Sequence, residues 1–289
     1  MSLTWRDEED TRQILSNVRA LTDKPFYANF VLHFNPTHFG VALDAGVPIV
    51  TFSWGNPAGL VKDARSAGTK VGVQVTSAES AKRMLELEPD FLIAQGVEAG
   101  GHVQSVNPLT QVLTDVVSVA GDVPVFAAGG LATGADLARM MHIGAAGGVF
   151  GTRFVASTES DAHPWYRSAL VEASPLDTVL TTCFNGEWPN AAHRVLQNST
   201  YLAWEAAGCP SPGNRPGEDE PTGFTAEGIP VPRYDNAMPR FDMTGNHEAM
   251  ALYAGTSIGK LGSVIPAANI VQLIWNQACA ILPEIAVTE

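Results

Sequence analysis

The chain has 289 residues, 45% of them hydrophobic and 16% charged, which is enough for one large core or for a core with an appendage. Its formal net charge of −13 argues against binding to nucleic acid or to an anionic membrane surface. No apolar run has the length of a membrane span, and the acidic residues 7–10 are unlike a signal peptide. Three widely spaced cysteines predict a cytoplasmic protein with reduced thiols, no disulfide framework and no metal site.

Helices and strands are expected to alternate along the first 160 residues. A helix at 8–20 precedes short apolar runs that are typical of buried strands in a parallel sheet. Strands are expected at 26–32, 49–53, 71–75, 91–95, 123–127 and 148–151, with helices at 37–45, 58–67, 78–87, 109–119 and 134–142 between them. This alternation predicts an α/β fold of the TIM-barrel-like (β/α) type.

The predicted sheet is too short for a closed barrel. Such a barrel needs eight strands, and the sequence supplies six. We therefore expect a barrel that is incomplete at the N-terminus, with two unpaired sheet edges. Either a partner chain, as in a homo-oligomer, or the C-terminal part of the chain would cover those edges.

Beyond residue 160 the sequence changes in character. Helical patterns run over 160–207, 246–254 and 267–282, and a Pro- and Gly-rich stretch at about 208–232 reads as a loop. We expect a barrel core at 1–160 and a small helical or lid region at 161–289.

The segment Gln95-Gly-Val-Glu-Ala-Gly-Gly-His102 is the most informative part of the chain. It follows the strand at 91–95, and sites in barrels and open α/β sheets lie at the carboxyl ends of strands. Glycines there let the backbone approach a flat ligand closely, because no Cβ intervenes. His102 is a candidate general base with an ordinary pKa of about 6.5, and a surface turn histidine is the alternative. Glu98 either tunes His102 or points into solvent.

Two glycine turns follow in the next two units. Gly129-Gly130 comes after the strand at 123–127, and Gly151-Thr152 comes after the strand at 148–151. Backbone N–H groups in such turns form an anion site, and barrel enzymes often bind phosphate after their last two strands. The other histidines carry less information: His142 is expected on a helix face, and the isolated His163, His193 and His247 in exposed or capping roles.

Three segments resemble the nitronate monooxygenases, FMN-dependent barrel enzymes once called 2-nitropropane dioxygenases. These segments are 95–102, 126–131 (Phe-Ala-Ala-Gly-Gly-Leu) and 149–160 (Val-Phe-Gly-Thr-Arg-Phe-Val-Ala-Ser-Thr-Glu-Ser). The likeness also covers Pro-Phe-Tyr-Ala-Asn at 25–29 and Ala-Leu-Tyr-Ala-Gly-Thr-Ser at 251–257, so it spans about 25–262 in the expected order. Members of this family normally open with two further strands, which the residues before Phe26 do not supply.

The resemblance implies FMN as cofactor and dioxygen as co-substrate. Alkyl nitronates, and by extension nitroalkanes, would be oxidised to a carbonyl compound and nitrite, with His102 as the base. The FMN phosphate would lie on the two glycine turns and the flavin ring beside Gly100 and Gly101. The implied cofactor-binding residues are Asn29, Gln74, Gln95, Gly100, Gly101, Gly129, Gly130, Gly151 and Thr152. For the three amide side chains, polar capping of strand ends is the alternative.

Two other functions stay open. An FMN-dependent NAD(P)H enoyl reductase is one, because that group also carries a Glu-Ala-Gly-Gly-His segment. A degenerate barrel that binds flavin without turnover is the other, and the missing strands motivate it.

Overall fold

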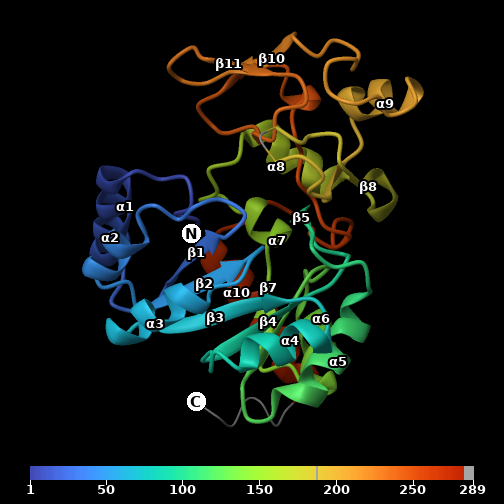
Figure 1. Ribbon diagram of the computed structural model, residues 1–289. Coiled ribbons are helices and arrows are strands. Elements are labelled where there is room, and N and C mark those ends of the chain that lie inside the picture. The colour runs from blue at the N-terminus through green and yellow to red at the C-terminus, as the bar shows by residue number, and fades with distance from the viewer. Residues whose placement is uncertain (187, 283–289) are drawn as a thin grey trace. The chain divides into compact units, whose positions relative to one another are not determined.

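The computed structural model describes residues 1–186 and 188–282, and helices and strands alternate through its first half (Figure 1). The elements are α1 (Glu8–Leu21), β1 (Tyr27–Val31), α2 (Phe39–Asp44), β2 (Ile49–Ser53), α3 (Ala58–Ser66), β3 (Lys70–Val75), α4 (Ala78–Leu85), β4 (Phe91–Gln95), β5 (Gly101–His102), α5 (Leu109–Ala120), β6 (Val125–Ala128), α6 (Gly134–Ile143), β7 (Gly147–Val149) and α7 (Thr152–Val155). Within the described residues, the main sheet has six strands in the order β1-β2-β3-β4-β6-β7. The predicted α/β fold is confirmed, with strands in chain order as in a (β/α) barrel.

The chain divides into two compact units that interleave along the sequence. The first comprises residues 1–95, 111–127 and 144–146, and the second comprises residues 96–110, 128–143 and 147–289. The boundary predicted near residue 160 differs from this division and stays a prediction.

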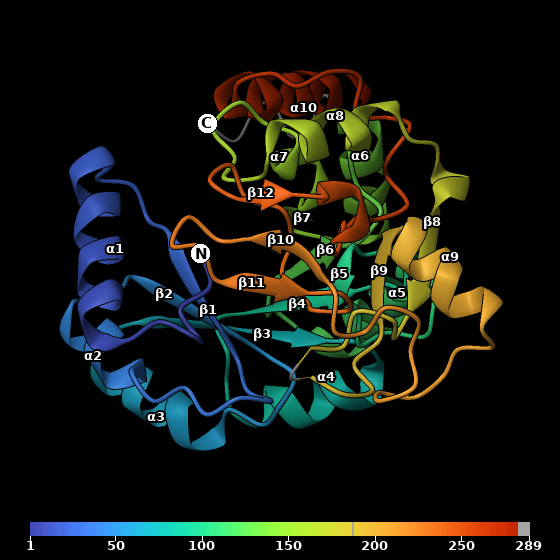
Figure 2. The same ribbon diagram turned by 90° about the horizontal axis from the view of Figure 1, so that it is seen from above.

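In the first unit, one face of the sheet is apolar and the other carries polar side chains. β1, β2, β3 and β4 pair in parallel, so alternate residues point to opposite faces. The apolar face consists of Ala28, Phe30, Val50, Phe52, Val71, Val73, Leu92 and Ala94. Helices α2, α3 and α4 lie along strands β1 to β3 (Figure 2), and Phe39 of α2 packs with its ring centroid 5.1 Å from Phe30 and 5.6 Å from Phe52. The strands therefore alternate, whereas the sequence suggested continuous apolar runs.

Residues 1–4 lie along the free edge of β1. Ser2 forms a parallel bridge with Asn29, whose N–H donates to the Met1 carbonyl at 2.7 Å and whose carbonyl accepts from Leu3 at 3.1 Å. The Val31 N–H donates to the Thr4 hydroxyl at 2.8 Å. The expectation of an unpaired edge is therefore wrong on the β1 side, where a short extended segment supplies hydrogen bonds.

The second unit continues with further helices and two small antiparallel sheets. Its later elements are α8 (Pro164–Glu172), the 3₁₀ turn η1 (Pro175–Asp177), β8 (Thr178–Thr181), β9 (His193–Leu196), α9 (Ser199–Ala206), β10 (Pro221–Phe224), β11 (Pro230–Pro232), β12 (Thr244–Gly245), the 3₁₀ turn η2 (His247–Ala249) and α10 (Ala267–Ile281). The sheets have the orders β5-β9-β8 and β11-β10-β12.

The predicted helical character of this region is wrong in two places. Residues 178–181 and 193–196 are the strands β8 and β9, which pair antiparallel, and β-branched residues are frequent in β8 (Thr178, Val179 and Thr181). Residues 246–254 form only a short 3₁₀ turn. The predicted Pro- and Gly-rich loop carries the short strands β10 and β11.

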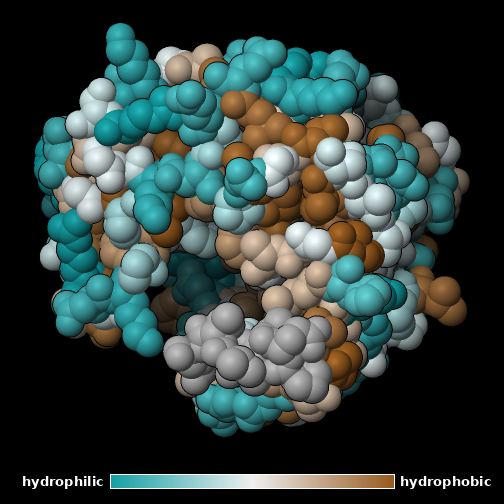
Figure 3. Space-filling model, turned by 90° about the horizontal axis from the view of Figure 1, so that it is seen from below, coloured by the Kyte–Doolittle hydropathy of each residue, from teal (hydrophilic) through white to brown (hydrophobic). Residues whose placement is uncertain are grey.

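Hydrophobic and hydrophilic side chains both reach the surface. Figure 3 shows both hydrophobic residues, in brown, and hydrophilic residues, in teal, exposed on the face that is in view. This mixture agrees with a chain in which only 16% of residues are charged. In the part of the chain that the structure describes, no helix combines the length and the hydropathy needed to cross a bilayer.

Candidate active site

His102 belongs to a short strand and does not project from a loose turn. β5 pairs antiparallel with β9, with Gly101 opposite Arg194 and His102 opposite His193. The adjoining Val103 N–H donates to the Ala192 carbonyl at 2.8 Å. The segment 96–102 thus runs from the end of β4 into a second sheet, and that sheet fixes the backbone position of His102.

The imidazole of His102 is surrounded by aromatic rings. It stacks on Trp188 with ring centroids 4.2 Å apart and an angle of 22° between the planes. The centroids of His193 and Tyr253 lie 5.3 Å and 5.7 Å away. His102 is half-buried, so the alternative of a surface turn histidine does not describe its surroundings.

These surroundings keep His102 neutral. Burial, and to a smaller extent the neighbouring His193, lowers the pKa of the His102 imidazole from 6.5 to about 4. The ring is therefore uncharged at neutral pH and accepts a proton weakly. The sequence suggested a base with an ordinary pKa, and a general base works best when its pKa lies near the working pH.

His193 is a site residue that the sequence did not reveal. It is fully buried, whereas an exposed or capping role was expected. Its Nε2 accepts from the Phe184 N–H at 3.1 Å, so the hydrogen lies on Nδ1, which is 2.9 Å from the Ala191 carbonyl. Burial lowers the pKa of His193 to about 4. Two backbone groups therefore hold one neutral tautomer.

The buried His193 makes the folding stability dependent on pH. Since its pKa is about 4 in the folded state and 6.5 in the unfolded state, the unfolded chain binds more protons between these values. Stability is complete above pH 6.5 and falls as the pH approaches 4. Between pH 7 and pH 4, this pKa difference should lower the free energy of unfolding by about 3 kcal/mol. Chemical denaturation of His193→Gln should show that this part of the pH dependence is absent. His142→Gln controls for the loss of a histidine elsewhere. An unchanged pH dependence in His193→Gln would contradict this assignment.

Several glycines let the loops of the second unit pack closely together. A Cβ on Gly100 would lie 2.4 Å from the backbone nitrogen of Gly255, and one on Gly130 would lie 2.9 Å from the Cβ of Glu98. Gly129, at φ +118°, would bring a Cβ within 3.1 Å of the Ala99 nitrogen. These three predicted cofactor-binding glycines therefore serve contacts between loops. Those contacts bring the turn after β6 next to the segment 96–102.

Gly101 and Gly151 differ from these glycines. A Cβ on either would meet no protein atom within 4 Å, so open space adjoins both positions. Gly101 has φ +74°, a conformation that favours glycine, whereas Gly151 has an ordinary φ of −94°. A ligand can approach the backbone at these two positions.

Thr152 connects the turn after β7 to the C-terminal segment. It is buried, and its Oγ1 accepts from the Gly255 N–H at 2.9 Å. This bond uses an oxygen lone pair and leaves the hydroxyl hydrogen as a donor. The neighbouring Thr256 N–H donates to the Glu98 carbonyl at 3.0 Å. Segment 254–256 therefore contacts both the loop of His102 and the turn at 151–152.

Two charged residues hold the segment 96–102 in place. Glu98 Oε2 accepts from the Leu109 N–H at 2.8 Å, which satisfies a donor at the start of α5. Its carboxylate therefore caps a helix, which differs from both expected roles. Arg194, which sequence reasoning missed, donates from Nε and Nη2 to the Val97 carbonyl at 3.2 and 2.8 Å. Its sequence context, one residue after an isolated histidine, carried no signal.

The three amide residues lie in the first unit, on the more polar face of its sheet. Asn29 Oδ1 accepts from the Thr51 hydroxyl at 3.0 Å. The registers place Asn29, Gln74 and Gln95 on that face in successive rows along the strands. Gln95 is buried and ends β4. Their contact with a cofactor stays a prediction.

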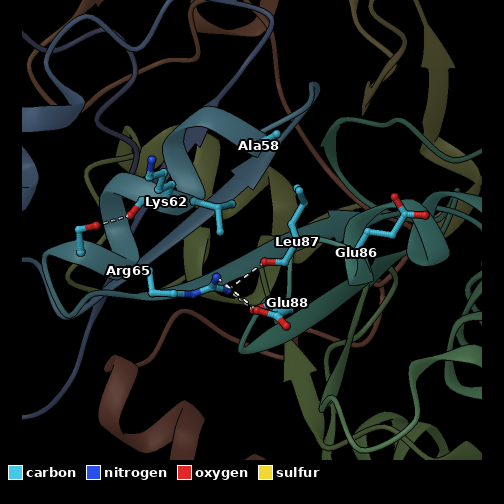
Figure 4. A pocket seen from close by; sticks show the side chains of 8 residues that line it. Ala58, Lys62, Arg65, Glu86, Leu87 and Glu88 are labelled. Atoms are coloured by element: carbon cyan, nitrogen blue, oxygen red, sulfur yellow. Dashed lines mark hydrogen bonds and ion pairs between the residues drawn. The ribbon is translucent and has the colours of Figure 1, made fainter.

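A separate groove in the first unit contains none of the predicted site residues. Figure 4 shows it between α3 and the residues that follow α4. Arg65 donates to the carbonyls of Leu87 and Glu88 at 2.9 and 2.7 Å and pairs with the Glu88 carboxylate at 3.4 Å. The Arg65 guanidinium therefore binds the residues that follow α4. Among residues 1–186 and 188–282, no three or more His, Cys, Asp or Glu side chains are grouped to hold a metal ion.

Comparison with known proteins identifies a family. A model of the family "Nitronate monooxygenase" matches residues 35–277. A nitronate monooxygenase of Pseudomonas aeruginosa is 27% identical, over 96% of this chain and 88% of its own length. A probable nitronate monooxygenase of Bacillus subtilis is 30% identical, but the alignment covers 77% of this chain and only 60% of that protein.

Solved structures agree on the fold. FabK from Thermotoga maritima has a TM-score of 0.81 and 28% identity, covering 98% of this chain and 85% of its own. Nitroalkane oxidase from Streptomyces ansochromogenes has a TM-score of 0.77 and 24% identity, covering 99% of this chain and 89% of its own. At that identity, the second likeness concerns the fold alone.

Proposed function

The chain belongs to the nitronate monooxygenase family and is a flavin oxidoreductase, and from this premise we propose that it oxidises alkyl nitronates with dioxygen to a carbonyl compound and nitrite. The observation that carries this proposal is the placement of His102. Its neutral imidazole lies on a short strand in the same unit as both glycine turns, and segment 254–256 connects their loops.

We propose FMN as the flavin. The residues of the second unit fit a phosphate-bearing flavin in two respects: open space adjoins the backbone of Gly101 and Gly151, and Thr152 retains a hydroxyl hydrogen beside that turn. Gly151 and Thr152 would bind the phosphate, and Gly101 would lie beside the ring. Bound FMN supplies the capacity to take electrons from a substrate and pass them to dioxygen.

The state of His102 favours a nitronate over its parent nitroalkane. A nitronate has already lost the proton next to nitrogen, so it requires no base. A neutral imidazole can instead donate its N–H to a nitronate oxygen and orient the anion. A nitroalkane requires proton removal, for which a ring with a pKa of about 4 is poorly matched at neutral pH.

One purified sample tests the function. We expect a visible absorbance maximum near about 450 nm, as for any oxidised flavin. The mass of the flavin released on heating should be that of FMN, and propionate-3-nitronate should yield nitrite aerobically. Heat-denatured protein with added FMN controls for nitrite formation without enzyme.

The open alternatives give different results. Rapid anaerobic bleaching by NADPH without nitrite would favour the enoyl reductase, which the shared segment 98–102 supports. A colourless protein that does not bind added flavin would favour neither enzyme.

Gly151→Ala tests the cofactor site. Because the new Cβ meets no protein atom within 4 Å, the unfolding free energy of the apoprotein should change by less than about 0.5 kcal/mol. If FMN lies against this turn, its Kd should rise by about tenfold or more, which corresponds to about 1.4 kcal/mol. Fluorescence titration of apoprotein with FMN measures this. Gly59→Ala, which also meets no atom within 4 Å, is the control, and equal FMN affinity in both variants would contradict the assignment.

A further inference from the structure

Arg153 is a buried cation next to the candidate cofactor turn. It follows Thr152 in α7, and only 3% of its surface is exposed. Its Nη1 donates to the Ser263 carbonyl at 3.2 Å, and within residues 1–186 and 188–282 no ion pair includes it. Arginine is rarely buried to this extent without a charged partner, because removing a charge from water is costly.

The acidic side chains of α6 and of the residues between α7 and α8 bind other groups. Asp136 pairs with Lys260 at 2.9 Å, and Asp161 pairs with Arg240 at 3.3 Å. The Glu159 carboxylate accepts from the first N–H of α10 at 2.9 Å. These carboxylates therefore do not balance the charge of the guanidinium in α7.

Arg215, a second largely buried arginine of the same unit, has its charge balanced within the chain. Its side chain is 10% exposed, pairs with the Glu218 carboxylate and donates to Asn185 Oδ1 at 2.9 Å. Its Cζ atom also lies 4.4 Å from the centroid of the Tyr234 ring. Burial lowers the pKa of Arg153, yet arginine stays charged at neutral pH, so a group outside the described residues has to balance this charge.

Arg153 and Thr152 both bind the segment 255–263. The Thr152 Oγ1 accepts from the Gly255 N–H at 2.9 Å, and the Arg153 guanidinium donates to the Ser263 carbonyl. Thr152 retains its hydroxyl hydrogen, and the guanidinium retains further N–H donors. Because neighbouring Cα atoms are about 3.8 Å apart, one phosphate group can contact both side chains. Open space adjoins the preceding residue, Gly151.

We propose that Arg153 binds the phosphate of the flavin nucleotide, so that the site discriminates FMN from riboflavin by charge. This inference rests on the FMN proposed above and adds the residue that recognises its charge. A phosphate monoester carries about 1.5 to 2 negative charges at neutral pH. The planar guanidinium matches it with two parallel N–H···O bonds. Riboflavin lacks this group and would leave the buried cation unbalanced.

Titration of the apoprotein with FMN and with riboflavin tests the inference. The unaltered protein should bind FMN at least about tenfold more tightly than riboflavin, and equal affinities would overturn the proposal. Arg153→Met should raise the Kd for FMN by about 10- to 100-fold and change the Kd for riboflavin by less than about threefold. Arg153→Lys keeps the charge without the planar fork, so its loss should be smaller. Equal losses for both ligands in Arg153→Met would indicate a structural role and overturn the proposal.

Arg139→Met is the matched control, because Arg139 is exposed on α6 in the same unit. It should leave both affinities unchanged. An FMN loss in Arg139→Met as large as in Arg153→Met would overturn the assignment to Arg153, since it would reflect the net charge of the protein.

The stability of the apoprotein separates ligand binding from a structural role without any assay of turnover. Removal of an unbalanced buried cation should leave the Tm of Arg153→Met equal to or above that of the unaltered apoprotein. Inorganic phosphate should raise the Tm of the unaltered apoprotein and of Arg139→Met, but not of Arg153→Met. A clearly lowered Tm in Arg153→Met, or the same response to phosphate, would overturn the inference. If these results hold but no nitrite is released, the proposed reaction fails and the role of Arg153 stands.

Discussion

Replacement of His102 by alanine is expected to lower the turnover number for propionate-3-nitronate by about 10²- to 10⁴-fold, the range that a positioned acid–base or donor group contributes. The reason is the loss of the imidazole that β5 carries in the second unit, where it stacks on Trp188. Steady-state nitrite release under air, with kcat and KM determined separately, measures the effect.

His142→Ala is the matched control, because His142 lies in the last turn of α6, on a different element from His102. Flavin content should be equal in both variants, so that the rate loss reports chemistry. Unchanged nitrite release in His102→Ala would remove His102 from the mechanism, whatever the flavin content.

Gly100→Ala is expected to disrupt the candidate site most strongly through the backbone. The added Cβ would lie 2.4 Å from the Gly255 nitrogen and 2.7 Å from the Ala254 carbonyl carbon, and backbone atoms cannot move aside without separating the two loops. Such overpacking destabilises by about 1–3 kcal/mol. Thermal unfolding of the apoprotein should show a lowered Tm.

Gly151→Ala provides the contrast, since open space surrounds its Cβ. The two variants should therefore give different results: Gly100→Ala should lower the stability of the apoprotein, whereas Gly151→Ala should lower only the affinity for flavin. If Gly100→Ala instead kept the Tm and lost flavin, Gly100 would face the flavin ring, as the family resemblance first suggested.

The alternating elements of the first half could be predicted from the sequence because their signals are local. Strands β1, β2, β3 and β6 are short apolar runs that a predicted helix follows directly, and β4 is a similar run that precedes the glycine-rich segment. For example, Ser77 caps α4 by accepting from the Ser80 N–H at 3.1 Å. The predicted bounds of these elements lie within a few residues of those observed.

The surroundings of His102 could not be predicted, because they depend on contacts between distant segments. His102 pairs with His193, 91 positions further along, and Arg194 reaches back to Val97, 97 positions earlier. No local sequence pattern predicts such a pairing. The apolar pattern of the hairpin that carries His193 also fits a helix. The position of His102 at the end of a glycine-rich segment could be read from the sequence, whereas its lowered pKa results from burial in the tertiary structure.

The interleaving of the two units has a consequence for handling the protein. The polypeptide passes from one unit to the other five times, after residues 95, 110, 127, 143 and 146. No single proteolytic cut can release either unit as a continuous fragment, and neither can be obtained by truncating a gene at one end. Deletion mapping is therefore unsuited to this enzyme, and point substitutions in the intact polypeptide are the appropriate way to assign its residues.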